Sequence, residues 1–222
     1  MIFKDRRDAG KQLAPRLTHL RGHNAIVLAL PRGGVVVGYE IARALGVSFD
    51  VIAARKLGAP GNPEFGFGAI APGGVRFLDE RTVALLGLSE ERIDRIVAEE
   101  AQEMERRLRR YRGEQPLPDV RQRAVILVDD GLATGVTARA AIRAIRRWEP
   151  GRLVLAVPVG APDTVRAVSS EVDELVCLET PPDFVAVGQY YLDFQQTSDD
   201  EVIELIERAR REAEGLSPAG DP

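Results

Sequence analysis

The stretch that decides the fold is Val125-Ile126-Leu127-Val128-Asp129-Asp130-Gly131-Leu132-Ala133-Thr134-Gly135-Val136-Thr137. Its four leading apolar residues predict a buried strand, and a loop of small residues leads from the two acids into an alanine-rich helix predicted over 137–148. Similar short apolar runs, separated by helical segments, occur at 25–30, 49–54, 153–157 and 175–178. Short strands without polar alternation are typical of a parallel sheet buried on both faces. We therefore predict an α/β fold: a mostly parallel central sheet with helices on both faces.

The acids and the loop of this stretch each suit one part of a ligand. Backbone N–H groups at the start of a helix, with the hydroxyls of Thr134 and Thr137, form an anion cradle suited to a phosphate monoester. The adjacent carboxylates of Asp129 and Asp130 can accept from vicinal hydroxyls, or hold magnesium through its waters. Asp-Asp-Gly alone is also a common turn with a helix cap. The whole unit favours a sugar phosphate.

This stretch resembles the 5-phosphoribosyl-1-pyrophosphate (PRPP) motif of the type I phosphoribosyltransferases at all thirteen positions, and the chain is also similar to a bacterial phosphoribosyltransferase-like subgroup carrying Arg-Lys-x-Gly-Ala-Pro-Gly-Asn, here at 55–62. The resemblance implies that Asp129 and Asp130 hold the ribose hydroxyls and Mg²⁺, the metal directly or through water. It implies that the 5′-phosphate lies on Ala133, Thr134, Gly135, Val136 and Thr137.

Two further segments follow predicted strands and carry basic residues. Pro31-Arg32-Gly33-Gly34 is a glycine turn by itself, and the resemblance makes Arg32, Gly33 and Gly34 pyrophosphate contacts. Arg55 and Lys56 follow the strand predicted over 49–54, where they are either a solvated pair or a second pyrophosphate contact. Because Lys56 is one of only three lysines, we group it with Asp129 and Asp130 as a catalytic candidate.

The remaining segments predict accessory elements. The glycine-rich stretch 58–74 predicts a loop with a hairpin arm over 62–75, where the family has a mobile catalytic loop. Ser89 caps a long amphipathic helix, an insertion over about 89–113 that covers a sheet edge or builds a homodimer contact. The aromatic residues of 180–197 predict either satellite core or a small hood, with a possible N-terminal contribution, that grips the acceptor through Phe184, Tyr190 and Tyr191.

Composition and charge limit the class of protein. A net charge of −4 over 222 residues argues against a protein that coats nucleic acid. No apolar run approaches the roughly 20 residues that span a bilayer, and the N-terminus has no secretory pattern. The lone Cys177 excludes an internal disulfide, and two histidines argue against structural zinc. We expect a cytoplasmic protein with one domain over 1–215, a core over about 25–178, and a tail over 216–222.

The predicted function is a phosphoribosyltransferase that binds PRPP and Mg²⁺ and transfers the 5-phosphoribosyl group to a nitrogenous acceptor, such as a nucleobase, with release of pyrophosphate. The alternative is a non-catalytic PRPP- or nucleotide-binding regulator on the same fold, although no segment resembles a DNA-binding domain. A dinucleotide-dependent oxidoreductase needs Gly-x-Gly-x-x-Gly after the first strand, where this chain has Pro-Arg-Gly-Gly-Val-Val-Val-Gly.

Overall fold

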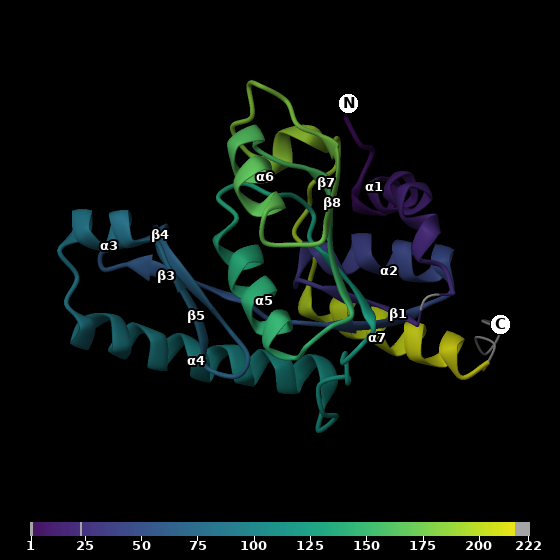
Figure 1. The fold of residues 1–222 in the computed structure, drawn as a ribbon, viewed down its shortest axis with the longest axis horizontal. Coiled ribbons are helices and arrows are strands. Elements are labelled where there is room, and N and C mark those ends of the chain that lie inside the picture. Colours follow the sequence, from purple (N-terminus) through teal and green to yellow (C-terminus); the bar gives the residue numbers. More distant parts are fainter. Residues whose placement is uncertain (1, 23, 216–222) are drawn as a thin grey trace.

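The computed structural model describes residues 2–22 and 24–215, so the tail predicted over 216–222 lies outside the described residues. Its centre is a five-stranded, fully parallel sheet in the order β2-β1-β6-β7-β8 (Figure 1). The strands are β1 (Ala25–Ala29), β2 (Ser48–Val51), β6 (Ala124–Val128), β7 (Arg152–Val159) and β8 (Glu174–Glu179). The predicted α/β fold with a parallel sheet is confirmed.

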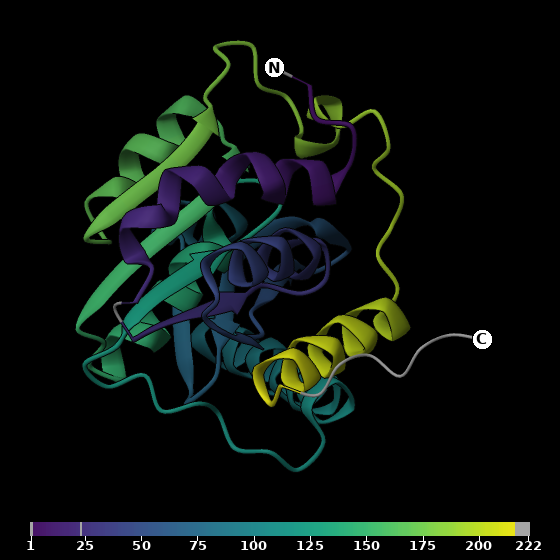
Figure 2. The same ribbon diagram turned by 90° about the vertical axis from the view of Figure 1, so that its right-hand side faces the viewer.

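Successive side chains of the central strands point to opposite faces, so each strand supplies two cores. Val27, Ile126 and Val154 pack on one face against α1 (Arg6–Leu13), the 3₁₀ helix η1 (Ala14–Leu20) and α2 (Gly33–Leu45). Leu28 and Leu127 pack on the other face against α5 (Val136–Arg147), beside which lies α6 (Pro162–Ser169). With α1 and α2 in front of the sheet and α5 and α6 behind it, the three layers are visible in Figure 2.

The first helix, α1, is short and is followed directly by a 3₁₀ helix. It starts at an N-cap, Asp5, whose side chain accepts a hydrogen bond from the Asp8 amide, and it ends at Leu13. Pro15 lies in the first turn of the next element, which continues as a 3₁₀ helix. Because a proline donates no N–H, Pro15 cannot continue the hydrogen-bond pattern of the α-helix, which explains the change.

The glycine-rich stretch contains the predicted hairpin arm, but a further strand stands where its composition predicts the start of a loop, so the stretch forms a second sheet. β3 (Arg55–Ala59), β4 (Asn62–Ala71) and β5 (Val75–Leu78) pair antiparallel and pack on α5. Two of the glycines allow this pairing: a Cβ on Gly68 would lie 2.4 Å from the Phe77 carbonyl oxygen, and one on Gly66 would lie 2.8 Å from the Lys56 side chain. The absence of a side chain at Gly66 and Gly68 therefore lets β4 pack closely against β3 and β5.

This second sheet also corrects the expected position of Arg55 and Lys56. The central strand β2 ends at Val51, so residues 52–54 leave the sheet and Arg55 opens β3 instead of following a central strand. The register within the second sheet pairs Lys56 with Ala69 of β4.

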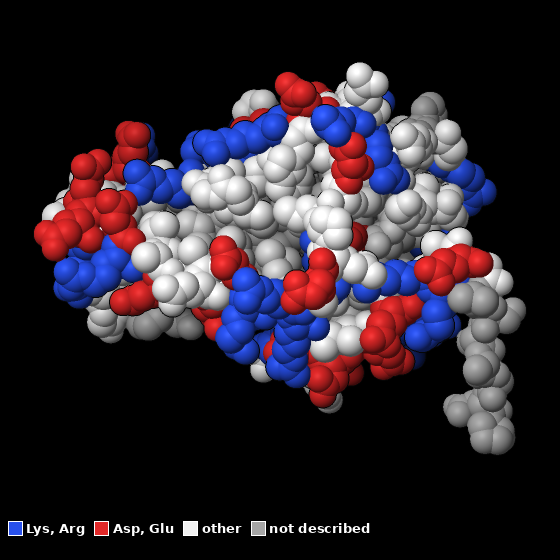
Figure 3. Space-filling view, turned by 90° about the horizontal axis from the view of Figure 1, so that it is seen from below, with Lys and Arg blue, Asp and Glu red and all other residues white. Residues whose placement is uncertain are grey.

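The long helix α4 (Glu90–Arg112) starts at the predicted cap, Ser89, whose hydroxyl accepts from the Arg92 amide. After the short helix α3 (Glu80–Leu86), it lies beneath β3 and β4, where Ile93 and Met104 pack on Phe67. Its C-terminal end contacts α7 (Asp199–Ala213), the helix whose N-cap, Ser198, accepts from the Glu201 amide. Figure 3 shows basic and acidic side chains side by side on this face of the molecule.

Several arginines of α4 are held by carboxylates of the same chain. Arg106 and Arg107 donate to Glu103, and Arg110 donates to Asp199 and Asp200. Arg112 is almost fully buried, with 5% of its side chain exposed, and pairs with Asp50 of β2 at 2.8 Å. The helix is therefore fastened to the central sheet at its C-terminal end. Across the described residues, no helix is both long and apolar enough to cross a membrane.

Candidate functional site

The two acids and the Pro-Arg-Gly-Gly bend meet at the carboxyl edge of the central sheet. Asp129 and Asp130 follow β6, and the bend follows the neighbouring strand β1. Between β1 and the bend, the Leu30 N–H donates to the Val128 carbonyl at 2.9 Å, which holds the two strand ends together. The close packing needs glycine. A Cβ on Gly33 would lie 1.9 Å from Asp130 Oδ2, and one on Gly34 would lie 2.9 Å from the Asp129 Cα. The peptide bond between Pro31 and Arg32 is cis.

The charge of the acid pair is partly balanced by Arg6 of α1. Its Nε donates to Asp130 Oδ2 at 2.7 Å, and only 11% of the Arg6 side chain and 17% of the Asp130 side chain are exposed. Asp129 Oδ1 accepts from the Asp130 amide at 2.8 Å. Burial, followed by the charge of Asp130, raises the pKa of Asp129 well above its ordinary value. Because the second negative charge is unfavourable here, hydroxyl donors or a cation beside the pair would stabilise its charged form.

The small-residue loop ends at the N-terminus of α5. Gly135 is the N-cap, with a left-handed φ of 73°, and makes no side-chain cap. Because the first N–H groups of a helix have no partner within the helix, the amides that open α5 remain available to an anion. The loop is anchored on either side: Leu132 N–H donates to the Val159 carbonyl, and the Thr164 hydroxyl donates to the Ala133 carbonyl at 2.6 Å. Ala133 and Thr134 themselves are exposed.

The aromatic segment covers one side of the acid pair together with the N-terminus. Phe3 is fully buried and pairs with Tyr191, since Phe3 N–H donates to the Tyr190 carbonyl and Leu192 N–H donates to the Phe3 carbonyl. Tyr191 is also buried, and its hydroxyl donates to the Asp130 carbonyl at 2.6 Å. The rings of Phe184 and Tyr190 stack on each other with centroids 5.7 Å apart. Tyr191 therefore supports the end of β6.

The basic residues predicted for the pyrophosphate side occupy two places. Arg32 lies in the bend itself, and its Nη1 is 3.9 Å from Asp199 at the start of α7. Arg55 donates from Nε to Glu100 of α4 at 2.7 Å. Lys56 passes over Gly66 and lines, with Arg55 and Glu100, a pocket of about 480 Å³ between the second sheet and α4.

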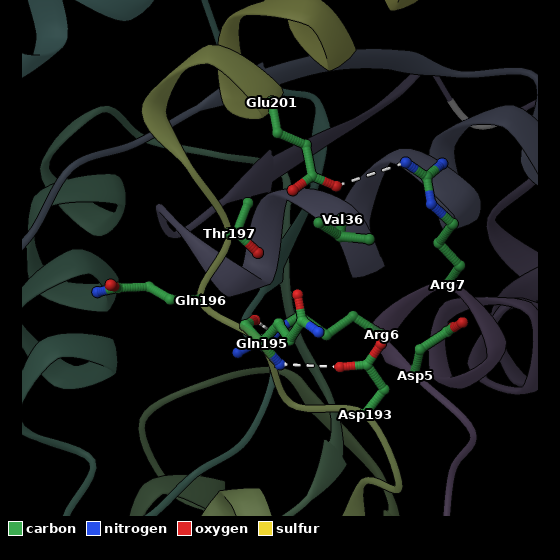
Figure 4. Close-up of a pocket in the computed structure, with 9 residues that line it drawn as sticks. All are labelled: Asp5, Arg6, Arg7, Val36, Asp193, Gln195, Gln196, Thr197 and Glu201. Atoms are coloured by element: carbon green, nitrogen blue, oxygen red, sulfur yellow. Dashed lines mark hydrogen bonds and ion pairs between the residues drawn. The ribbon is translucent and has the colours of Figure 1, made fainter.

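A second pocket, of about 250 Å³, lies beside Arg6 (Figure 4). Its lining is mostly polar and comes from the start of α1, from α2, from the segment before α7 and from α7: Asp5, Arg6, Arg7, Val36, Asp193, Gln195, Gln196, Thr197 and Glu201. Sequence reasoning missed Arg6 because its partner Asp130 lies 124 positions away. Arginine is abundant in this chain, so no local signal distinguishes this residue.

No cluster of three or more His, Cys, Asp or Glu side chains arranged to hold a metal occurs in residues 2–22 and 24–215. The two carboxylates at the end of β6 do fit Mg²⁺, because this ion usually keeps several waters and takes one or two carboxylates together with substrate oxygens. Asp129 and Asp130 are therefore the residues suited to it. Cys177 is a free cysteine, and burial raises its pKa to about 11.

Comparison with known proteins agrees with this geometry. Two strains of Mycobacterium tuberculosis, CDC 1551 and H37Rv, have proteins named "Putative phosphoribosyl transferase" that are 45% identical to this chain over 224 residues. The match takes in 100% of the chain but 51% of each relative, so the chain spans about half the length of these curated relatives.

Among solved structures, TT1426 from Thermus thermophilus is 42% identical with a TM-score of 0.79, covering 94% of this chain and 99% of that one. AQ2163 from Aquifex aeolicus, 11% identical with a TM-score of 0.50 over 79% of this chain and 74% of that one, shares the fold. The family model of the phosphoribosyl transferase domain matches residues 6–195. The matched segment includes Arg6 and its hydrogen-bond partners Asp130 and Gln195. The chain belongs to the phosphoribosyl transferase domain family.

Proposed function

We propose that the protein binds PRPP with Mg²⁺ and transfers the 5-phosphoribosyl group to a nitrogenous acceptor. The observation that carries this proposal is the contact between the bend and the acid pair, where Gly33 leaves no room for a single extra carbon atom beside Asp130. Family membership supports the reaction class. In the transfer, the bond between C1 of the ribose and the pyrophosphate oxygen breaks, and a bond from C1 to the acceptor nitrogen replaces it.

Each part of the proposed site has a separate task. The carboxylates of Asp129 and Asp130 accept from the ribose hydroxyls. The amides and hydroxyls of residues 133–137 bind the 5′-phosphate, as the exposed Ala133 and Thr134 before α5 allow. The amides of the bend, with Arg32, bind the pyrophosphate. These contacts accelerate the reaction by positioning the substrate and by stabilising the charge that develops on the leaving group.

Mg²⁺, when bound at the acid pair, supplies positive charge that offsets the negative charge of the pyrophosphate. Lys56 and Arg55 are also proposed pyrophosphate contacts, but they lie on β3 and not in the bend. Arg55 is engaged by Glu100 at the start of β3, and Lys56 lines the pocket against α4.

For the acceptor, we propose the space between the aromatic segment and the bend. Phe184 and Tyr190 remain candidates for stacking on a flat acceptor, because both are only partly buried. Tyr191 has a supporting role, since its hydroxyl already bonds to the backbone of Asp130.

The test is pyrophosphate release from PRPP and MgCl₂ with a panel of purine, pyrimidine and orotate-like acceptors. Calorimetric binding of PRPP accompanies it. We expect Mg²⁺-dependent PRPP binding, release of pyrophosphate with at least one acceptor, and loss of PRPP binding in the Asp129→Asn/Asp130→Asn protein with its thermal unfolding intact. Binding without turnover on any acceptor would support the regulatory alternative. Failure of the wild-type protein to bind PRPP would refute both.

A further inference from the structure

Arg6 connects four parts of the candidate site. Its Nε donates to Asp130 Oδ2 at 2.7 Å, and its Nη1 donates to the Gln195 carbonyl at 2.7 Å. The guanidinium lies 4.0 Å above the centre of the Phe194 ring, a distance typical of a cation–π contact. The same guanidinium packs against Gly33, since its Nε lies 2.6 Å from the position that a Cβ on Gly33 would take.

These contacts hold the carboxylate of Asp130 in one orientation. A carboxylate at the end of a strand can rotate, whereas one that accepts from a buried arginine keeps one oxygen engaged and presents the other. The positive charge of Arg6 also offsets the repulsion between two adjacent acids, which would otherwise push their side chains apart. Lysine would not replace these features, because it lacks the planar fork that reaches Asp130 and Gln195 at once.

We propose that Arg6 is a positioning residue that orients the Asp130 carboxylate toward the ribose of a phosphoribosyl ligand. The inference rests on the proposed function and adds a residue outside the strand-loop-helix motif. It commits to a specific outcome: Arg6 affects ligands that carry ribose hydroxyls and leaves unaffected those that carry only phosphate groups.

The experiment compares ribose 5-phosphate with inorganic pyrophosphate, both titrated calorimetrically into the full chain without Mg²⁺, because Mg²⁺ at the acid pair would make pyrophosphate binding depend on Asp130 as well. In Arg6→Met the orienting hydrogen bond is lost, so we expect ribose 5-phosphate to bind about ten- to a hundredfold more weakly. Pyrophosphate should bind within about twofold of wild type, because Arg6 donates its hydrogen bonds to Asp130 and Gln195 and not to the bend that binds pyrophosphate in our proposal. Arg7→Met is the matched control, because Arg7 contacts Glu40 and Glu201 and is 43% exposed.

A double-mutant cycle separates positioning from general loosening. If Arg6 acts through Asp130, then Arg6→Met adds no further loss of ribose 5-phosphate affinity to Asp130→Asn. Should Arg6→Met prove insoluble, Arg6→Lys keeps the charge without the fork and should give a ribose 5-phosphate affinity between that of wild type and that of Asp130→Asn.

Three outcomes overturn the proposal. Wild-type affinity for ribose 5-phosphate in Arg6→Met, or in Arg6→Lys where that variant is used, shows that Asp130 needs no positioning. Equal losses for ribose 5-phosphate and pyrophosphate show that Arg6 only stabilises the fold. If the wild-type protein binds neither of these two ligands, the proposal also fails, and PRPP binding in the presence of MgCl₂ then shows whether the proposed function fails with it.

Discussion

Replacing Gly33 with alanine tests whether the bend and the acid pair form one site. The new Cβ would lie 1.9 Å from Asp130 Oδ2 and 2.6 Å from Arg6 Nε, so these side-chain atoms must move. The carboxylate would rotate away from its 2.7 Å bond with Arg6 and from the ligand. A hydrogen bond to a charged group is worth about 1.5–3 kcal/mol, so PRPP affinity should fall by about 10- to 150-fold.

Two other glycines provide the comparison. Alanine at Gly34 would press on the Val128 carbonyl at 2.8 Å and on the Asp129 Cα at 2.9 Å, which are backbone atoms that cannot rotate away. Overpacking of this kind costs about 1–3 kcal/mol of stability. Gly151→Ala is the control, since its Cβ would press on the Gln122 carbonyl at 2.8 Å before β7, at the opposite edge of the sheet.

The assay is calorimetric PRPP binding with MgCl₂ beside thermal unfolding of all three variants. We expect Gly33→Ala to lose affinity with a small change in Tm, Gly34→Ala to lose both, and Gly151→Ala to lose only stability. At this chain length, each kcal/mol lowers Tm by about 2–4 °C. Wild-type affinity in Gly33→Ala would refute the argument that the bend and the acids form one ligand site.

Three further predictions concern Asp50, Asp199 and Cys177. Asp50→Ala leaves Arg112 buried without its carboxylate and should lower the free energy of unfolding in urea by about 3–5 kcal/mol; a loss below about 1 kcal/mol would mean that the pair behaves as an exposed one. The Tyr111 hydroxyl, followed by nearby arginines, lowers the pKa of Asp199 below 3.8, so this carboxylate stabilises the fold above that pH and its contribution is lost as the pH falls through the lowered pKa. Asp199→Asn should accordingly lower Tm at neutral pH, with a gap from wild type that narrows in acid; a gap that persists unchanged would contradict this origin. Because burial raises the pKa of Cys177 to about 11, its alkylation by iodoacetamide at about pH 8 should be slow in the folded protein and fast in concentrated urea, and equal rates would show an accessible thiolate.

The elements that the sequence predicts well are those with local signals. β6 contains all four residues of the strand predicted from Val125 to Val128, and α4 begins after Ser89, the serine predicted to cap it. The hairpin of the second sheet was predicted but its third strand, β3, was not, because glycines such as Gly66 and Gly68 suggest a mobile loop by composition, whereas here the absence of a side chain lets β4 approach its neighbours. Contacts between distant segments leave no local pattern.

The site shows the same division between local and distant signals. The acids and the loop before α5 are continuous in sequence, so their proximity follows from chain connectivity alone. The bend joins them because parallel neighbours end at one edge of a sheet, which is a topological argument. The partners from the N-terminus and from residues 190–197 follow only from tertiary packing, as the backbone pairing of Phe3 with Tyr191 illustrates.

The position of α5 between two sheets has a consequence for how the loop before it behaves in time. Its alanines, including Ala138 and Ala141, are fully buried, and its core includes Ala69 and Phe77 of the second sheet as well as Leu127 of the central one. A helix packed on both sides has little freedom to change its orientation, so the amides at its N-terminus should point in the same directions before and after an anion binds. Ligand capture there would then require little ordering of the chain, and hydrogen–deuterium exchange should find the body of α5 among the slowest regions of the molecule.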